Sequence, residues 1–161
     1  MAVRVNNELG EWFAAEIGSL QGDPISPIAF ITLLERVMET VECDSGDIGV
    51  NIHGIRIKDL RFADDIDLLT EKEPDLQIAL SNLNNSSKRF GLKINKSKTK
   101  VMVMSRRSVQ TEPIVIDGEP IEQVTEFIYL GSLITNTNDC TPEIRRRINL
   151  ANQAFGRLKQ L

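Results

Sequence analysis

The chain has 161 residues, of which 41% are hydrophobic and 26% charged, and its formal net charge is −4. This suits one globular domain with a hydrophobic core, or a large piece of a bigger protein. No run reaches the length of a membrane-spanning helix, and the first residues lack the apolar block of a signal peptide, so we expect no membrane partner and a protein of the nucleus or cytoplasm. Cys43 and Cys140 match no metal-binding spacing and predict free thiols in a reducing compartment.

The first half of the chain predicts two helices that flank a β-hairpin. Residues 26–41 place apolar side chains on one helical face after a possible N-cap at Ser26. Residues 54–62 alternate as a strand, and residues 66–70 read as the returning strand, which puts the acid pair of "RFADDIDLL" at the hairpin turn. Residues 74–90 again show helical spacing, and Gly91 can end that helix.

The second half predicts short strands and a last helix. Residues 92–95 and 100–105 read as strands, residues 114–121 as a hairpin with its turn at Asp117, and residues 126–135 as a further strand. The last helix opens at Thr141 and carries an apolar stripe. The whole predicts an α+β fold in which helices pack on an antiparallel sheet.

Charge is segregated along the chain. Residues 1–80 hold 6 Lys and Arg against 16 Asp and Glu, whereas residues 81–161 hold 13 against 7. Eight basic residues and no acidic ones lie between Lys88 and Arg107. Such a stripe is typical of a surface that binds a phosphate backbone, and equally of a solvated basic face.

Asp64 and Asp65 have two readings. Aspartate is a common turn residue, and for an isolated pair the turn alone explains it. Two adjacent carboxylates at a hairpin tip can also reach one small volume, and Mg²⁺ prefers oxygen ligands of this kind together with substrate phosphates. The pair alone does not decide between them.

Four segments, in this order, resemble the palm of reverse transcriptases from non-LTR retrotransposons, elements that often also encode an endonuclease. They are "GSLQGDPISPIAF", "RFADDIDLL", "GLKINKSKTKVMVM" and "FIYLGSLIT". The resemblance implies a right-hand polymerase, with a partial palm over residues 1–135 and the start of the thumb over residues 136–161. It also implies an RNA-directed DNA polymerase that adds deoxynucleotides to a primer 3′-hydroxyl with two Mg²⁺ ions, and whose partners are template RNA, primer DNA and deoxynucleotide triphosphates.

The resemblance also assigns residues. Asp64 and Asp65 match the catalytic metal ligands, while Asp67 matches no assigned position. The expected nucleotide and template contacts are Gln21, Gly22, Asp23, Pro24, Lys93 and Lys98. The primer-grip-like hairpin is Tyr129, Leu130 and Gly131, and the expected contacts to the nucleic-acid backbone are Arg145, Arg146 and Arg147.

The sequence departs from the family pattern at a position that the polymerase activity requires. The family's other essential aspartate lies upstream of "QGDP", but residues 1–20 contain no aspartate, and the fingers are missing too. We therefore expect an incomplete metal site and a fragment that is inactive alone. A nucleic-acid-binding module without catalysis and a protein-interaction module are the alternatives, and the oligomeric state is left open.

Overall fold

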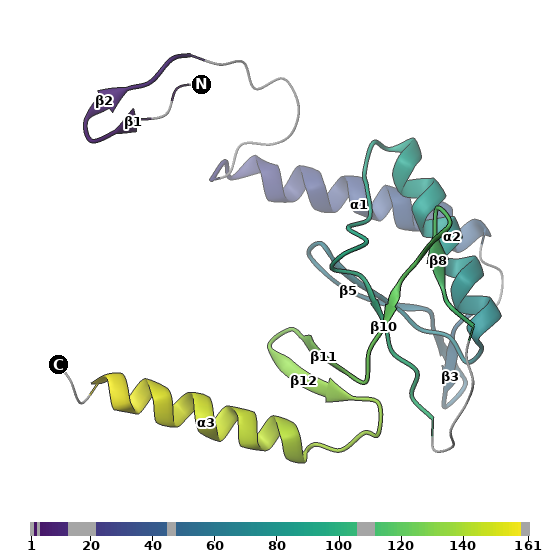
Figure 1. The fold of residues 1–161 in the computed structure, drawn as a ribbon. Helices are drawn as coiled ribbons and strands as arrows, with labels where there is room; N and C mark the ends of the chain where they lie inside the picture. The colour runs from purple at the N-terminus through teal and green to yellow at the C-terminus, as the bar shows by residue number, and fades with distance from the viewer. Residues whose placement is uncertain (1, 3, 13–21, 45–47, 106–111, 159–161) are drawn as a thin grey trace. The chain divides into compact units, whose positions relative to one another are not determined.

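The computed structural model describes residues 2, 4–12, 22–44, 48–105 and 112–158 (Figure 1). The chain forms two compact units, Met1–Arg36 and Val37–Leu161. The helices of the described residues are α1 (Ile25–Asp44), α2 (Glu73–Arg89) and α3 (Thr141–Leu158). None of these is both long and apolar enough to cross a membrane.

Strands in the described residues are short and pair two by two. They are β1 (Arg4–Val5), β2 (Glu8–Leu9), β3 (Val50–Ile52), β4 (Ile55–Ile57), β5 (Asp59–Phe62), β6 (Asp65–Leu68), β7 (Lys100–Val101), β8 (Val115–Ile116), β9 (Glu119–Pro120), β10 (Glu122–Gln123), β11 (Glu126–Tyr129) and β12 (Ser132–Thr135). Five pairs are antiparallel and β7–β10 is parallel. The mixture of helices and small sheets confirms the α+β class, but the single antiparallel sheet that we expected is replaced by separate ladders, one of them parallel.

In the first unit, β1 and β2 form a hairpin and α1 begins one residue earlier than predicted. Asp23, rather than Ser26, provides the cap. Its carboxylate accepts hydrogen bonds from the Ile25 backbone N–H at 3.1 Å and from the Ser26 hydroxyl at 3.3 Å. This satisfies a donor that the first turn of a helix leaves without a backbone partner.

Several predicted strands of the second unit differ in the structure. Residues 126–135 form the β11–β12 hairpin instead of one strand, and within residues 100–105 the strand covers Lys100–Val101 alone. The predicted strand 54–62 is split at Lys58, because β4 pairs with β3 whereas β5 pairs with β6. Residues 92–95 are not a strand. The Asn95 carbonyl accepts hydrogen bonds from the backbone N–H groups of Lys98 and Thr99, and its side chain accepts one from the Ser97 hydroxyl. Asparagine often diverts the backbone into such a turn.

The core of the second unit lies on both sides of α2. One cluster is formed by Leu80, Val101, Ile114, Ile116 and Ile121, and the other by Val37, Met38, Val41 and Leu83. Leu68 of β6 packs against both clusters. The β5–β6 hairpin is therefore anchored to the core through one face of β6.

Polar side chains of α2 fasten the β8–β9 hairpin beside it. The Gln77 amide accepts a hydrogen bond from the Val115 N–H at 2.8 Å and donates one to the Val115 carbonyl at 3.0 Å. Two turns further along, Asn84 donates to Asp117 at 2.9 Å. Asp117 and Gly118 form the turn of β8–β9, as predicted, and both have positive φ.

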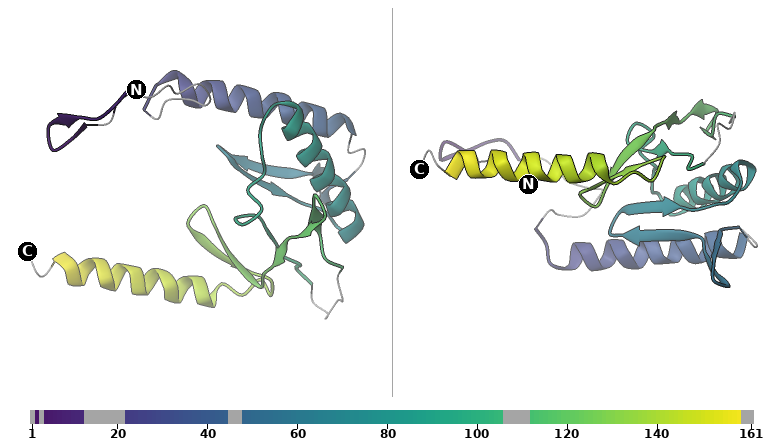
Figure 2. Two further views of the ribbon diagram at one scale, coloured as in Figure 1. Left: turned by 45° about the horizontal axis from the view of Figure 1, so that its top comes forward. Right: turned by 90° about the horizontal axis from the view of Figure 1, so that it is seen from below.

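The last helix follows the β11–β12 hairpin. Figure 2 shows α3 continuing as one uninterrupted helix after that hairpin.

Candidate active site

The acid pair lies at the tip of the β5–β6 hairpin. Phe62 pairs with Asp65, which leaves Ala63 and Asp64 as the two turn residues. Ala63 has a φ of +53°, in the left-handed region that a side chain disfavours. The predicted hairpin turn is confirmed, with the refinement that Asp65 is already the first residue of β6.

Alternation along β6 explains how carboxylates occur within an apolar run. Ile66 and Leu68 pack against the core, so Asp65 and Asp67 point to the opposite face of the hairpin. Phe62 of β5 lies on that same outer face, since residues directly opposite in an antiparallel ladder share a face, and its side chain is 62% exposed. We call this outer face, with Phe62, Asp65 and Asp67 and the Asp64 turn at its end, the acidic face.

The two carboxylates at the tip are available for a ligand. Asp64 and Asp65 are both exposed, and neither carboxylate has a hydrogen bond or an ion pair with any residue that the structure describes. By contrast, Asp59 at the start of β5 is paired with Arg61 at 2.7 Å. Within one hairpin, therefore, Asp59 is neutralised by an ion pair, whereas the carboxylates of Asp64 and Asp65 have no such partner among the described residues.

The β11–β12 hairpin meets the acidic face through Tyr129. Burial raises the pKa of the Asp67 carboxyl, the charge of Asp65 raises it further, and a hydrogen bond from the Tyr129 hydroxyl opposes both effects. The pKa of Tyr129 is raised by burial and then by the charges of Asp67 and Asp65. Tyr129, predicted for the primer-grip-like hairpin, therefore lies near Asp65, predicted as a metal ligand, and Asp67 is the contact that the sequence did not assign.

The acidic face suits a hard divalent cation, with an incomplete set of ligands. Carboxylate oxygens are what Mg²⁺ prefers, and it is commonly held by one or two carboxylates plus water and substrate phosphates. Among the described residues, no group of three or more Asp, Glu, His or Cys side chains is placed to hold a metal ion. Asp64 and Asp65 can therefore contribute two ligands, and further oxygen ligands have to come from elsewhere.

The predicted nucleotide and template residues at 21–24 belong to the first unit. Gln21 lies outside the described residues. Gly22 has a φ of +92°, which favours glycine at this turn, and Pro24 is exposed. Asp23 caps α1, so its carboxylate already has partners.

The basic stripe is partly neutralised within the second unit. Lys88 contacts Asp117 at 2.5 Å, Lys96 contacts Glu119 at 2.9 Å, and Lys100 is paired with Glu122. Lys93 and Lys98, the two lysines predicted near the nucleotide, are exposed and have no ion pair with a described residue.

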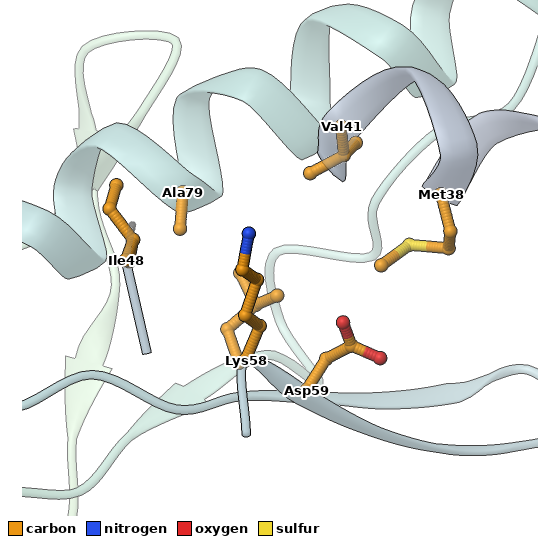
Figure 3. Close-up of a pocket in the computed structure, with 7 residues that line it drawn as sticks. Met38, Val41, Ile48, Lys58, Asp59 and Ala79 are labelled. Atoms are coloured by element: carbon orange, nitrogen blue, oxygen red, sulfur yellow. The ribbon is translucent and has the colours of Figure 1, made fainter. Parts of the chain in front are cut away.

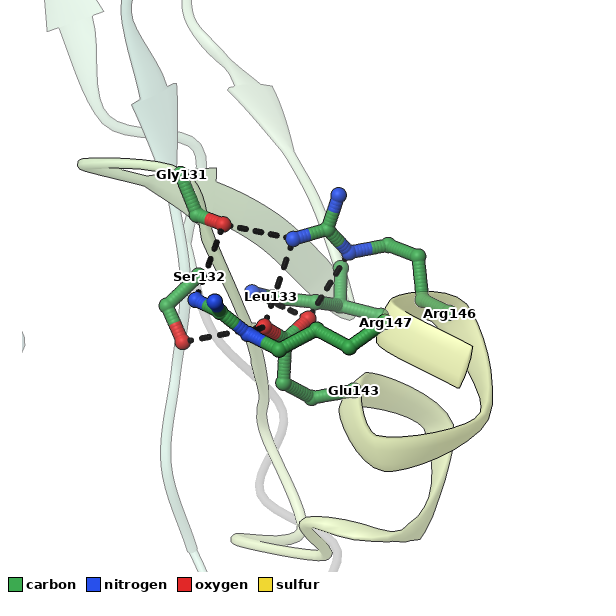
Figure 4. Close-up of polar contacts among 6 residues, drawn as sticks. All are labelled: Gly131, Ser132, Leu133, Glu143, Arg146 and Arg147. Carbon is green, nitrogen blue, oxygen red and sulfur yellow. Dashed lines mark hydrogen bonds and ion pairs between the residues drawn. The ribbon is translucent and has the colours of Figure 1, made fainter. Parts of the chain in front are cut away.

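The three consecutive arginines of α3 also divide into two groups. Arg146 and Arg147 bind the carboxylate of Glu143 and reach the carbonyl oxygen of Gly131 (Figure 4). Arg145 is exposed and takes no part in that cluster. Its contact to a nucleic-acid backbone stays a prediction.

Sequence reasoning did not single out Glu143. It lies at the third position of α3, and Arg146 and Arg147 follow at spacings of three and four residues. Opposite charges at these spacings lie on one side of a helix and pair, so the signal was present in the sequence. What the sequence could not show is the β-hairpin that the same carboxylate contacts.

A small pocket lies on the core side of β5 and β6, lined in part by Met38, Val41, Lys58, Asp59 and Leu68 (Figure 3). It holds only about 20 Å³, roughly the space for one water molecule. Because it is on the opposite side of the hairpin from the acidic face, it is separate from the candidate metal ligands.

Comparison with known proteins identifies the family of this chain. The model of the family described as reverse transcriptase (RNA-dependent DNA polymerase) matches residues 1–134. The chain is 33% identical over 162 aligned positions to the Pol polyprotein of the type-2 retrotransposable element R2DM of Drosophila melanogaster, covering 94% of this chain and 14% of that one. It is 30% identical to the Pol polyprotein of the type-1 element R2 of Nasonia vitripennis, covering 88% and 14%.

An uncharacterized transposon-derived protein of Caenorhabditis elegans is 35% identical over 111 residues, covering 66% of this chain and 39% of that protein. The chain thus spans well under half the length of these curated relatives. Because the family model covers most of the chain, and the R2 relatives align with nearly all of it, the chain belongs to the reverse transcriptase (RNA-dependent DNA polymerase) family of non-LTR retrotransposons.

Proposed function

We propose that this chain forms part of the palm of an RNA-directed DNA polymerase, in which the acidic face holds catalytic Mg²⁺ and α3 begins the thumb. The observation that carries the proposal is the exposed Asp64–Asp65 pair at a hairpin tip, without partners among the described residues and beside Tyr129. The reaction would be the template-directed addition of a deoxynucleotide to a primer 3′-hydroxyl, with release of pyrophosphate.

The residues have distinct tasks in this proposal. When bound, Mg²⁺ supplies Lewis-acid stabilisation for the phosphates and for the attacking oxygen. Asp64 and Asp65 would hold the ions, and Tyr129 would support the surface beside them on which the primer end rests. Lys93 and Lys98 would approach the triphosphate, and in support of this neither lysine is paired with a described residue.

The chain by itself is expected to be inactive. Two Mg²⁺ ions would need more oxygen ligands than Asp64 and Asp65 supply, and residues 1–20 contain no aspartate to add one. The chain alone should therefore fail to extend a primed RNA template with Mg²⁺ or Mn²⁺. Extension that disappears with Asp64→Asn would show that the chain carries a complete site.

Metal binding can be tested directly with Mn²⁺ as a paramagnetic probe. With primer–template and deoxynucleotide present, Mn²⁺ should broaden the NMR signals of residues 62–67 first. Asp64→Asn and Asp65→Asn should each abolish this selectivity, whereas Glu126→Gln, which removes an exposed acid of β11, should preserve it. Equal broadening in all four proteins would remove the support for the acidic face as a metal site.

Nucleic-acid binding is tested by two matched lysine pairs. Replacing Lys93 and Lys98 by Gln should lower the log–log salt slope of binding by up to about 1.8 on duplex DNA. Replacing Lys96 and Lys100 by Gln should change it much less, because these lysines already pair with Glu119 and Glu122. If both pairs give the same slope, neither lysine assignment holds.

A further inference from the structure

A single carboxylate connects α3 to the β11–β12 hairpin. Glu143 is only 9% exposed, although it lies in the first turn of a helix whose other faces are largely solvated. Its Oε2 accepts a hydrogen bond from the backbone N–H of Leu133 at 2.9 Å, and its Oε1 accepts one from the Ser132 hydroxyl at 3.4 Å (Figure 4). Both partners belong to β12, so Glu143 joins its own helix to another element.

Two arginines complete the cluster. Arg146 binds Glu143 with both ends of its fork, Nε to Oε2 at 2.7 Å and Nη2 to Oε1 at 3.2 Å. Arg147 donates from Nε to Oε1 at 2.5 Å. Arg146 Nη2 also donates to the Gly131 carbonyl at 2.5 Å, and Arg147 Nη2 reaches the same oxygen at 3.4 Å. Glu143 thus orients the guanidinium groups that hold the turn of the hairpin.

The turn of the β11–β12 hairpin directly follows Tyr129, the residue that lies near the acidic face. Leu130 and Gly131 both have positive φ, at +47° and +78°, and leucine is poorly suited to this conformation. Beyond the ladder itself, the Gly131 carbonyl of this turn is held by Arg146 and Arg147. Tyr129, the residue before it, faces Asp67 of β6.

We propose that Glu143 is a positioning residue, which through Arg146 fixes the tip of the β11–β12 hairpin and hence the place of Tyr129 beside the acidic face. The proposal rests on the proposed function, since a fixed hairpin matters to catalysis only if the primer end lies there. It gives the start of α3 a specific task, which is to hold the primer-side surface of the palm.

A plain helix-capping role for Glu143 makes a different prediction. An acidic side chain in the first turn interacts favourably with the helix dipole, and its loss would fray α3 alone. Arg146 has no part in that effect. The two roles are therefore separated by changes to Arg146 and by what happens in the hairpin.

The first experiment measures amide hydrogen exchange in the whole 161-residue chain. Glu143→Gln and Arg146→Gln should each speed exchange at residues 129–133 by about tenfold, because charge-assisted hydrogen bonds that close the hairpin tip are lost. Arg146→Lys should restore little, since lysine cannot bind both the carboxylate and the Gly131 carbonyl with a planar fork. Glu126→Gln on β11 and Arg157→Gln at the end of α3 are the matched controls, and neither should change this segment.

Unchanged hairpin exchange in Arg146→Gln, or faster exchange confined to α3, would overturn the proposal in favour of capping. If Glu143→Gln unfolds the chain, Arg146→Gln, which leaves Glu143 its bond to Leu133, decides the question.

The second experiment follows a primer whose 3′ end carries a photoreactive nucleotide. Cross-linking to the β11–β12 hairpin should fall at least about fivefold in Glu143→Gln and Arg146→Gln, and should be unchanged in the two controls. Normal cross-linking in both variants would overturn the positioning role. Absence of cross-linking in the unaltered chain would instead count against the proposed function, while the exchange result would still decide whether Glu143 fixes the hairpin.

Discussion

Replacing Ala63 by glycine should stabilise the protein. Ala63 lies at the first position of the two-residue β5–β6 turn with a φ of +53°. A left-handed conformation costs a residue with a Cβ about 1–2 kcal/mol. Glycine removes that cost but adds about 0.4–1 kcal/mol of unfolded-state entropy, so the net gain should be about 0.5–1 kcal/mol.

Urea denaturation measures this gain. With a slope of about 2 kcal/mol per molar urea, the midpoint of Ala63→Gly should rise by about 0.3–0.5 M. The matched control is Ala151→Gly on the exposed surface of α3, where the backbone is helical and the same change should destabilise by about 1 kcal/mol. A midpoint that falls by the same amount in both variants would refute the left-handed geometry of Ala63.

The same variant separates stability from function. Glycine makes several backbone conformations accessible at the tip, so Asp64 would lose the single direction that the strained turn imposes. We expect weaker selective broadening by Mn²⁺ in Ala63→Gly although its midpoint is higher. If the urea midpoint and the selective broadening both increased, the strained conformation of Ala63 would have no role in positioning Asp64 for the metal.

Three further changes test other parts of the structure. Asp64→Asn should leave the free energy of unfolding of the metal-free chain unchanged or raise it by about 0.5–1 kcal/mol, since a like-charge neighbour is removed; a marked loss in a thermal melt would make Asp64 a structural turn residue. Gln77→Ala should destabilise by about 2 kcal/mol, because both backbone groups of Val115 lose their partner, whereas Asn85→Ala on the exposed side of α2 should cost less than about 0.5 kcal/mol. Finally, hydrogen bonds from Arg146 and from the Leu133 N–H hold the pKa of Glu143 at about 2, against an ordinary 4.5. A lowered pKa means that its stabilising contribution is present above pH 4.5 and is lost as the pH falls toward 2, so Glu143→Gln should be less sensitive than the unaltered chain over that interval in an acid titration followed by circular dichroism.

The features predicted well from sequence are those set by local spacing. The apolar stripes of the three helices, the stop at Gly91 and the turns at Asp64 and Asp117 depend on neighbours within a few residues. Such patterns reflect burial of one helix face or the φ preferences of turn residues, and these are largely independent of the rest of the chain.

The features missed depend on partners far away in sequence. Glu122 of β10 lies beside Lys100 of β7 in a parallel pair, and the residues near either of them give no local signal of this pairing. The predicted strand at 92–95 competes with side-chain hydrogen bonds of Asn95, which prevailed. Likewise, Glu143 shows its helical pairing in the sequence, but its bond to Leu133 becomes visible only once β12 is placed.

The distribution of paired and unpaired charges bears on how the site works. The sequence predicted a basic stripe between Lys88 and Arg107, yet Lys88, Lys96 and Lys100 meet acids within the second unit. These lysines are therefore balanced within the fold, which distinguishes them from Asp64 and Asp65. Two adjacent exposed carboxylates oppose each other's ionisation, and under the proposed function a cation would relieve this repulsion. Asp64 and Asp65 lie where the core anchors the strand behind them through Ile66 and Leu68, which fixes their backbone without using their charge. Under the proposed function, such a hairpin would bind and release Mg²⁺ at each nucleotide addition without loss of the fold, because the core and not the carboxylates holds its strands.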